Sequence, residues 1–216
     1  MAQTSADTPP EGTRAALIAA GVALFGSKGF AATSTREIAA RAKTNVASIA
    51  YHFGGKEGLR QACGAQFAQR LTAVLQQAPV PADLRPDEAR ALLHAGFARM
   101  IGFILGQAEA AEMVSFMLRE VSENSPIVDQ VYAGFMEGTH RNVCALWGLA
   151  SGCAPESDAV RLSVFSFIGQ ILYFRIGNRI VARRMGWDAL GQGEAAQIAA
   201  VLLVHLDAML GTTGKV

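Results

Sequence analysis

The chain has 216 residues, of which 51% are hydrophobic and 17% are charged, and its formal net charge is +1. That length is sufficient for one small and one larger domain with an apolar core. The overall charge is too small to indicate any class of partner. The three cysteines, Cys63, Cys144 and Cys153, lack CxxC spacing and indicate buried thiols in a reducing compartment rather than a disulfide framework. A redox sensor is the alternative, although nothing basic is arranged to form a thiolate.

Residues typical of catalysis or metal binding form no recognisable arrangement. The four histidines, at positions 52, 94, 140 and 205, are far apart and lack HExxH spacing, and the chain has neither a GxSxG elbow nor a phosphate-binding loop. We therefore expect no enzyme activity, no cofactor and no metal site.

Neither a signal peptide nor a membrane span is predicted. Residues 1–12 lack the charged start and apolar run of a signal peptide and are expected to form a disordered arm. Leu162–Phe174 is 13 residues without a formal charge, whereas roughly 20 are needed to cross a bilayer. A cytoplasmic protein without a membrane partner is expected.

The first predicted helices are short and have marked ends. A helix is predicted over residues 13–27, followed by two shorter ones between residues 34 and 53 that are joined by a turn. Ser34 and Glu37 form a capping box, in which the hydroxyl accepts from the backbone N–H of Glu37 and the carboxylate reaches back. Asn45 is a preferred N-cap for the last of the three helices.

That last helix has a thin inward face, formed by Ile49 and Phe53 with Ala50 beside them. A helix this short needs tertiary packing to be stable, and so thin a face leaves its outer side free. The outer side chains are small, hydrogen-bonding or aromatic: Val46, Ala47, Ser48, Tyr51 and His52. Such side chains suit base edges and phosphate oxygens. The pattern favours a helix-turn-helix DNA reader, and the alternative is a solvated helix pair in an all-helical protein.

Basic side chains are concentrated in the same part of the chain. Residues 13–60 hold seven basic and two acidic side chains, a net charge of +5, whereas residues 61–216 hold 12 basic and 14 acidic ones, a net charge of −2. This distribution agrees with DNA as the partner of the helix pair.

The rest of the chain is predicted to be helical, because Pro and Gly punctuate apolar runs that show no strand-like alternation. Helices are expected over about 56–75, 86–104, 109–122, 124–150, 156–184 and 194–210. The helix over 156–184 carries two apolar stripes, and the helix over 194–210 has a comparable face. One small core does not easily cover both stripes of the helix over 156–184. The alternative is that this helix lies at the centre of a monomer's core.

Three linked blocks resemble the DNA-binding domain of the TetR family of bacterial transcriptional regulators. They are LFGSKGF at 24–30, TSTREIA at 33–39 and YHFGGKEGL at 51–59. The resemblance implies an all-α fold with an N-terminal three-helix helix-turn-helix domain over 13–59, a C-terminal ligand-binding and dimerisation domain over 60–211, and a tail over 212–216. It implies that the DNA-binding residues are Thr35, Arg36, Asn45, Val46, Ala47, Ser48, Tyr51, His52 and Lys56. Lys56 would hold a phosphate at a helix start.

Two positions depart from the pattern of that family. Lys43 and Thr44 occupy the turn, where the family usually has Gly and then an aliphatic residue. If position 43 requires a positive φ, lysine costs about 1 kcal/mol relative to glycine. Ala50 stands where an aromatic residue is common, and together with the block that follows it resembles the CecR-like branch, which has a CerR-type C-terminal domain.

The resemblance further implies a dimer and a small-molecule effector of unknown identity. The helices over 156–184 and 194–210 would pair with their symmetry mates in a four-helix bundle. The effector residues implied are Met100, Phe103, Phe116, Met117, Arg119, Phe135, Trp147, Phe165, Gln170, Tyr173 and Arg175. Each apolar residue in this set could instead be ordinary core. Arg175 could instead form a salt bridge to Glu120 or another acid, since polar groups within apolar helical stretches need partners.

These observations together predict a DNA-binding transcriptional regulator that binds a palindromic operator as a homodimer and is released by a small-molecule effector. By analogy with the family, a repressor is expected. The alternative is a helical ligand-binding or adaptor protein whose altered turn has weakened its binding to DNA.

Overall fold

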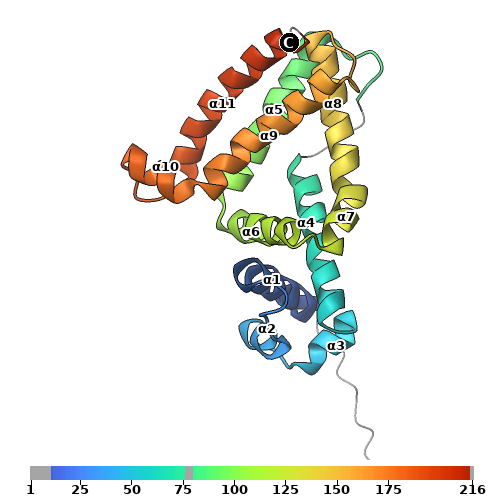
Figure 1. The fold of residues 1–216 in the computed structure, drawn as a ribbon, viewed down its shortest axis with the longest axis vertical. Helices are drawn as coiled ribbons and strands as arrows, with labels where there is room; N and C mark the ends of the chain where they lie inside the picture. Colours follow the sequence, from blue (N-terminus) through green and yellow to red (C-terminus); the bar gives the residue numbers. More distant parts are fainter. Residues whose placement is uncertain (1–10, 76–79, 215–216) are drawn as a thin grey trace, which may run out of the picture. The chain divides into compact units, whose positions relative to one another are not determined.

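The structure is a computed structural model that describes residues 11–75 and 80–214. Its helices are α1 (Glu11–Lys28), α2 (Thr35–Arg41), α3 (Ala47–Phe53), α4 (Lys56–Leu75), α5 (Pro86–Gly106), α6 (Ala108–Ser122), α7 (Pro126–Val131), the π-helix η1 (Tyr132–Met136), α8 (Glu137–Ser151), α9 (Asp158–Ile176), α10 (Asn178–Met185) and α11 (Gln192–Thr212), as Figure 1 shows. All regular structure in the described residues is helical, which confirms the all-α prediction. Of the arm predicted over residues 1–12, residues 1–10 lie outside the described residues, as do residues 215–216 of the predicted tail. Glu11 and Gly12 belong to α1, so the predicted arm is wrong at these two residues.

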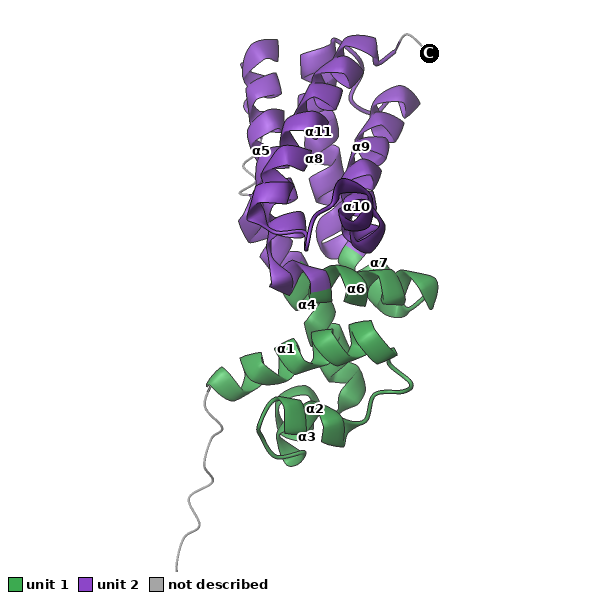
Figure 2. Ribbon diagram, turned by 90° about the vertical axis from the view of Figure 1, so that its left-hand side faces the viewer, with its two compact units in different colours: residues 1–67, 112–131 green, residues 68–111, 132–216 purple. Residues whose placement is uncertain are grey.

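The chain divides into two compact units, which Figure 2 shows in different colours. Unit 1 comprises the residues up to Phe67 together with Glu112–Val131, and unit 2 comprises Ala68–Ala111 together with the residues from Tyr132 onward. This division differs from the expected domain ranges, 13–59 and 60–211. Most of α6 and all of α7 belong to the same unit as the helix-turn-helix.

Unit 1 is held together by apolar contacts between α1 and the segments that follow it. Leu17 and Phe25 of α1 are fully buried, and the rings of Phe25 and Phe116 from α6 lie 6.5 Å apart. The approach of α6 to α1 depends on Gly26, because a Cβ atom at this position would lie 2.9 Å from the backbone nitrogen of Phe116. The core of the reader therefore includes a helix that follows α4 and α5 in the chain.

Unit 2 is a helical bundle whose core is built around aromatic side chains. Phe167 of α9 is fully buried, and its ring centroid lies 4.5 Å from that of Phe97 on α5 and 6.3 Å from that of Trp147 on α8. The indole N–H of Trp147 donates to the hydroxyl of Thr213 at 3.0 Å. This hydrogen bond satisfies the polar atom of a side chain that is otherwise fully buried.

The prediction of a single long helix over 156–184 is wrong. Helix α9 ends at Ile176, and α10 starts at Asn178 after Gly177. Gly177 is packed closely, since a Cβ atom there would lie 3.1 Å from the carbonyl oxygen of Tyr173. The helix predicted over 124–150 is similarly divided into α7, η1 and α8.

Three helices of unit 2, α5, α9 and α11, are long and apolar enough to cross a membrane by length and composition alone. Their buried sides supply much of the core of unit 2, with residues such as Leu93, Phe167 and Leu206. An apolar helix with one side in a core is the expected pattern for a soluble bundle.

Candidate nucleic-acid interface

The start of α2 is fixed by the predicted capping box. The Ser34 hydroxyl accepts from the backbone N–H of Glu37 at 3.2 Å, and the Glu37 carboxylate accepts from the backbone N–H of Ser34 at 2.8 Å. Lys28, at the end of α1, donates to the other oxygen of the same carboxylate. The Lys28 hydrogen bond, followed by those from Ser34, lowers the pKa of Glu37 to about 2.

This arrangement predicts how the α2 cap responds to acid. Because the folded pKa of Glu37 lies below its unfolded value of 4.5, the cap is fully stabilising above that value and loses its contribution as the pH falls towards 2. An NMR titration of the Glu37 side-chain carbon should give a midpoint near 2 in the native protein. Replacing Lys28 by methionine removes the hydrogen bond that contributes most to the low pKa of Glu37, so the midpoint should rise. An unchanged midpoint would contradict the assignment of the low pKa to Lys28.

The turn between α2 and α3 has the geometry of a Schellman motif. The backbone N–H of Lys43 donates to the Ala40 carbonyl at 3.1 Å, and that of Thr44 donates to the Ala39 carbonyl at 2.9 Å. Both bonds require a left-handed residue after the C-cap, and Lys43 has a φ of +54°. Position 43 therefore has the positive φ at which lysine is less favourable than glycine. A left-handed residue with a Cβ atom costs about 1–2 kcal/mol.

The recognition helix α3 is held by its ends and by one buried residue. The Asn45 side-chain oxygen accepts from the backbone N–H of Ala47, the first residue of α3, at 2.9 Å. The N-cap residue is Val46 rather than the predicted Asn45, and the Val46 side chain makes no capping hydrogen bond. Ile49 is the one α3 residue that is fully buried, whereas Phe53 is half-buried with the Arg14 guanidinium 5.5 Å from its ring centroid. The predicted inward position of Ala50 is wrong, since this residue is exposed. The inward face of α3 is thus even thinner than expected.

The predicted DNA-binding residues differ in the solvent exposure of their side chains. Five are exposed: Arg36, Asn45, Val46, Ala47 and Tyr51. Thr35, Ser48, His52 and Lys56 are half-buried. The Ser48 hydroxyl lies 3.2 Å from that of Thr44, and the Nε2 atom of His52 is buried without a hydrogen-bond partner in the described part of the chain.

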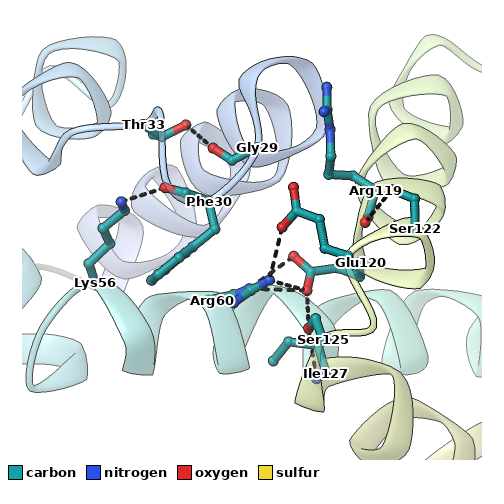
Figure 3. Close-up of polar contacts among 11 residues, drawn as sticks. Gly29, Phe30, Thr33, Lys56, Arg60, Arg119, Glu120, Ser122, Ser125 and Ile127 are labelled. Carbon is teal, nitrogen blue, oxygen red and sulfur yellow. Dashed lines mark hydrogen bonds and ion pairs between the residues drawn. The ribbon is translucent and has the colours of Figure 1, made fainter.

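Lys56 is engaged within unit 1, as Figure 3 shows. Its ammonium group donates to the carbonyl oxygen of Phe30 and lies 4.2 Å from the centroid of the Phe30 ring. The charge is therefore positioned by the loop that follows α1. Its contact with a phosphate remains a prediction.

Of the seven basic side chains counted over residues 13–60, three form ion pairs in the structure, and a fourth, Lys56, donates to a backbone carbonyl. Lys28 pairs with Glu37, Arg41 with Glu112, and Arg60 with Glu120 and Glu123. Within residues 13–60 of the described chain, the cations with neither an acidic partner nor a backbone acceptor are Arg14, Arg36 and Lys43. The charge available to DNA is consequently smaller and more localised than the sequence total of +5 suggested.

A buried ion network joins α4 to the end of α6, and sequence reasoning missed it (Figure 3). The Arg60 guanidinium donates to both Glu120 carboxylate oxygens at 3.0 Å and lies 3.4 Å from the Glu123 carboxylate. Glu120 is 0% exposed and also accepts from the Ser125 hydroxyl. The alternative predicted pair, Arg175 with Glu120, is wrong, because Arg60 occupies the carboxylate. The available signal was a glutamate within an apolar helical stretch, which identified Glu120 but not its partner.

The predicted effector residues are divided between the two units. In unit 2, Met100, Phe103, Phe135 and Trp147 are buried, whereas Phe165 and Tyr173 are each 57% exposed. Phe116, Met117 and Arg119 belong to unit 1, where Arg119 donates to the Ser27 carbonyl at 3.2 Å.

The polar effector candidates of unit 2 have no acidic partner among the described residues. Gln170 lies 3.2 Å from a ring nitrogen of His205, and Arg175 donates to the Ile104 carbonyl at 3.5 Å. Partial burial lowers the pKa of Arg175.

Unit 2 also contains an open groove of about 570 Å³. Its lining consists mainly of small and neutral residues of α5 and α11: Ala98, Gly102, Gln107, Gln192, Ala195, Ala196, Ala199, Ala200 and Leu203. None of the predicted effector residues lines it. Within residues 11–75 and 80–214, no group of three His, Cys, Asp or Glu side chains is arranged to hold a metal ion.

Comparison with known proteins agrees with this geometry. Residues 17–63 match the profile of the bacterial regulatory proteins of the tetR family, and residues 89–213 match that of the C-terminal domain of the HTH-type transcriptional dual regulator CecR. The chain belongs to the TetR family and is of the CecR type. As a TetR-family member, it is a DNA-binding transcriptional regulator.

Individual relatives support this membership. The chain is 33% identical to the HTH-type transcriptional dual regulator CecR of Shigella flexneri over 210 residues, which cover 90% of this chain and 89% of CecR. It is 30% identical to the probable HTH-type transcriptional regulator YttP of Bacillus subtilis over 57% of this chain and 58% of YttP.

Solved structures of TetR-family proteins have the same fold. A TetR-like transcriptional regulator from a Rhodococcus species superposes with a TM-score of 0.67 at 18% identity, covering 93% of this chain and 94% of that one. The TetR-family regulator PfmR from Thermus thermophilus gives a TM-score of 0.59 at 21% identity over 90% of this chain and 94% of PfmR.

Proposed function

We propose that this TetR-family regulator binds a palindromic operator as a homodimer, acts as a repressor and is released by a small-molecule effector. The observation that carries the proposal is the exposed outer face of α3, where Val46, Ala47 and Tyr51 have no role in the core of unit 1. An exposed helix of this kind can enter the major groove, with its first turn against base edges.

The homodimer is supported by apolar surface on α9 and α11. Leu162, Phe165 and Tyr173 of α9 are between 57% and 64% exposed, and Val201 and Val204 of α11 are 52% and 67% exposed. Exposed apolar surface of this kind typically marks an interface between proteins. A twofold axis through these helices would present two copies of α3 to an inverted repeat.

The effector is proposed to bind within unit 2, at those of the predicted side chains that lie in this unit. Met100, Phe103 and Trp147 are buried apolar side chains of unit 2, and Gln170 and Arg175 are polar groups without an acidic partner in the described residues. Such a ligand releases DNA only if it binds the DNA-free form more tightly than the DNA-bound form.

Repression is the proposed sign of regulation, because a dimer seated on an operator blocks access to the DNA that it covers. The relative CecR is named a dual regulator, so a second target with the opposite sign is compatible with this type of protein. The proposed location is the cytoplasm, where the DNA lies, and no membrane partner is proposed.

Sequence-specific DNA binding is the direct test. The full-length protein should bind a duplex taken from upstream of its own gene more tightly than a random duplex of equal length, by about 10³-fold or more. Replacing Ser48 by alanine should mainly reduce this ratio, whereas replacing Lys56 by alanine should weaken binding to both duplexes. Equal affinities of the wild-type protein for the two duplexes would contradict the proposal that it is a sequence-specific regulator.

A further inference from the structure

Lys43 has a backbone conformation that its side chain disfavours. Among the described residues, the non-glycine residues with a positive φ are Lys43, at +54°, and Asn124, at +48°. Asparagine tolerates the left-handed region comparatively well, whereas a long side chain does not. Glycine would satisfy the same Schellman motif without that steric cost. The lysine is therefore locally unfavourable, which suggests that its side chain is needed elsewhere.

The Lys43 ammonium group has no partner within the described part of the protein. The side chain is exposed and takes part in no hydrogen bond or ion pair there. By contrast, the neighbouring Arg41 is neutralised by Glu112 at 3.1 Å. A solvated lysine that pairs with nothing contributes nothing to the fold that would offset the strain of its backbone.

The position of Lys43 relates it to the recognition helix. It directly precedes Thr44 and Asn45, and the Asn45 side chain accepts from the backbone N–H of Ala47, the first residue of α3. The exposed residues of that turn, Val46 and Ala47, are the ones that the proposed function places against DNA. A cation on a flexible stem beside that turn is suited to a backbone phosphate flanking the bases being read.

We propose that Lys43 is a phosphate-contacting residue of the DNA interface, and that its charge is the reason for the strained turn. The proposal rests on the proposed function, because it requires α3 to face DNA. It adds a contact that the site residues carried over from the family do not include, at a position where the family usually has glycine.

The test combines binding and stability measurements on the full-length protein. Lys43→Gly should weaken binding to both the upstream duplex and a random duplex, and should reduce the slope of log K against log salt by about 0.9 for each bound protomer between roughly 50 and 200 mM salt. The same variant should melt about 2–4 °C higher, since the strain is relieved. Weaker binding by a more stable protein cannot be attributed to misfolding.

Three further variants separate charge from conformation and from bulk electrostatics. Lys43→Gln should lose the same salt slope without the gain in melting temperature, whereas Lys43→Arg should retain the slope. Arg184→Gln removes an exposed arginine of α10 that has no ion pair in the described chain, and should leave the slope unchanged.

If the slope of log K against log salt is unchanged in Lys43→Gly, or falls equally in Arg184→Gln, the proposed phosphate contact is wrong, even though the wild-type protein binds DNA. If the wild-type protein binds neither duplex, the proposed function fails, and the role of Lys43 fails with it.

Discussion

Replacing Glu120 by alanine is expected to destabilise the protein by about 3–5 kcal/mol, because it leaves the buried Arg60 guanidinium without its main counter-charge. Glu120 is 0% exposed, and Arg60 is 8% exposed. Glu123, at 3.4 Å, is partly exposed and compensates only in part. The loss corresponds to a fall in melting temperature of about 6–20 °C for a chain of this size, which calorimetry or circular dichroism would measure.

A matched control is available at the surface of unit 2. Arg70 and Glu109 form the same type of pair at 3.1 Å, with side chains that are 41% and 52% exposed. Glu109→Ala should cost less than about 1 kcal/mol, as exposed ion pairs generally do. Equal effects of Glu120→Ala and Glu109→Ala would show that the Arg60 network contributes no more than a surface pair.

A double variant tests whether the loss arises from the orphaned charge. Changing Arg60 to methionine together with Glu120 to leucine removes both ions and keeps the apolar volume, so it should recover much of the stability lost in Glu120→Ala. Because Glu120 and α3 belong to the same compact unit, we expect Glu120→Ala also to lower DNA affinity at temperatures near its reduced melting point.

Introducing a charge on the exposed face of α11 is expected to abolish the proposed dimer. Val204 is 67% exposed, so Val204→Glu should leave the folded protomer intact. In a dimer formed through α9 and α11, however, it would bury two unpaired carboxylates and raise the dissociation constant by about 100-fold or more. Sedimentation or light scattering should then report a monomer, and binding to a palindromic duplex should fall in parallel.

Two companion variants locate the interface. Leu162→Glu on α9, where Leu162 is 64% exposed, should have the same effect as Val204→Glu. Leu92→Glu on α5, where the leucine is 47% exposed, should leave the dimer unchanged. A dimer that tolerates both Val204→Glu and Leu162→Glu would refute the assignment of these helices to the interface.

The local features of the DNA reader could be predicted from the sequence, because they depend on neighbours a few residues apart. The Ser34–Glu37 capping box and the hydrogen bond from the Ala47 N–H to the Asn45 side chain involve groups within three residues of one another. The positive φ of Lys43 belongs to a turn whose hydrogen bonds span at most five residues. Such geometry is determined by residue type and spacing. The all-α fold and the TetR-type blocks were predicted for the same reason, since periodicity and motif spacing are local properties.

The tertiary structure alone decided which groups are paired across long separations. Arg60 and Glu120 are 60 residues apart, and the sequence analysis named Arg175 instead of Arg60 as a possible partner of Glu120. Likewise, the basic residues of the reader could be counted from the sequence. The ion pair between Arg41 and Glu112, which neutralises one of them, depends on how α6 packs in unit 1. The sequence thus determined the helical class and the kind of reader, but not the division of 124–150 and 156–184 into shorter helices. The free charges on the reader depend on contacts between segments distant in the chain, which residue spacing does not encode.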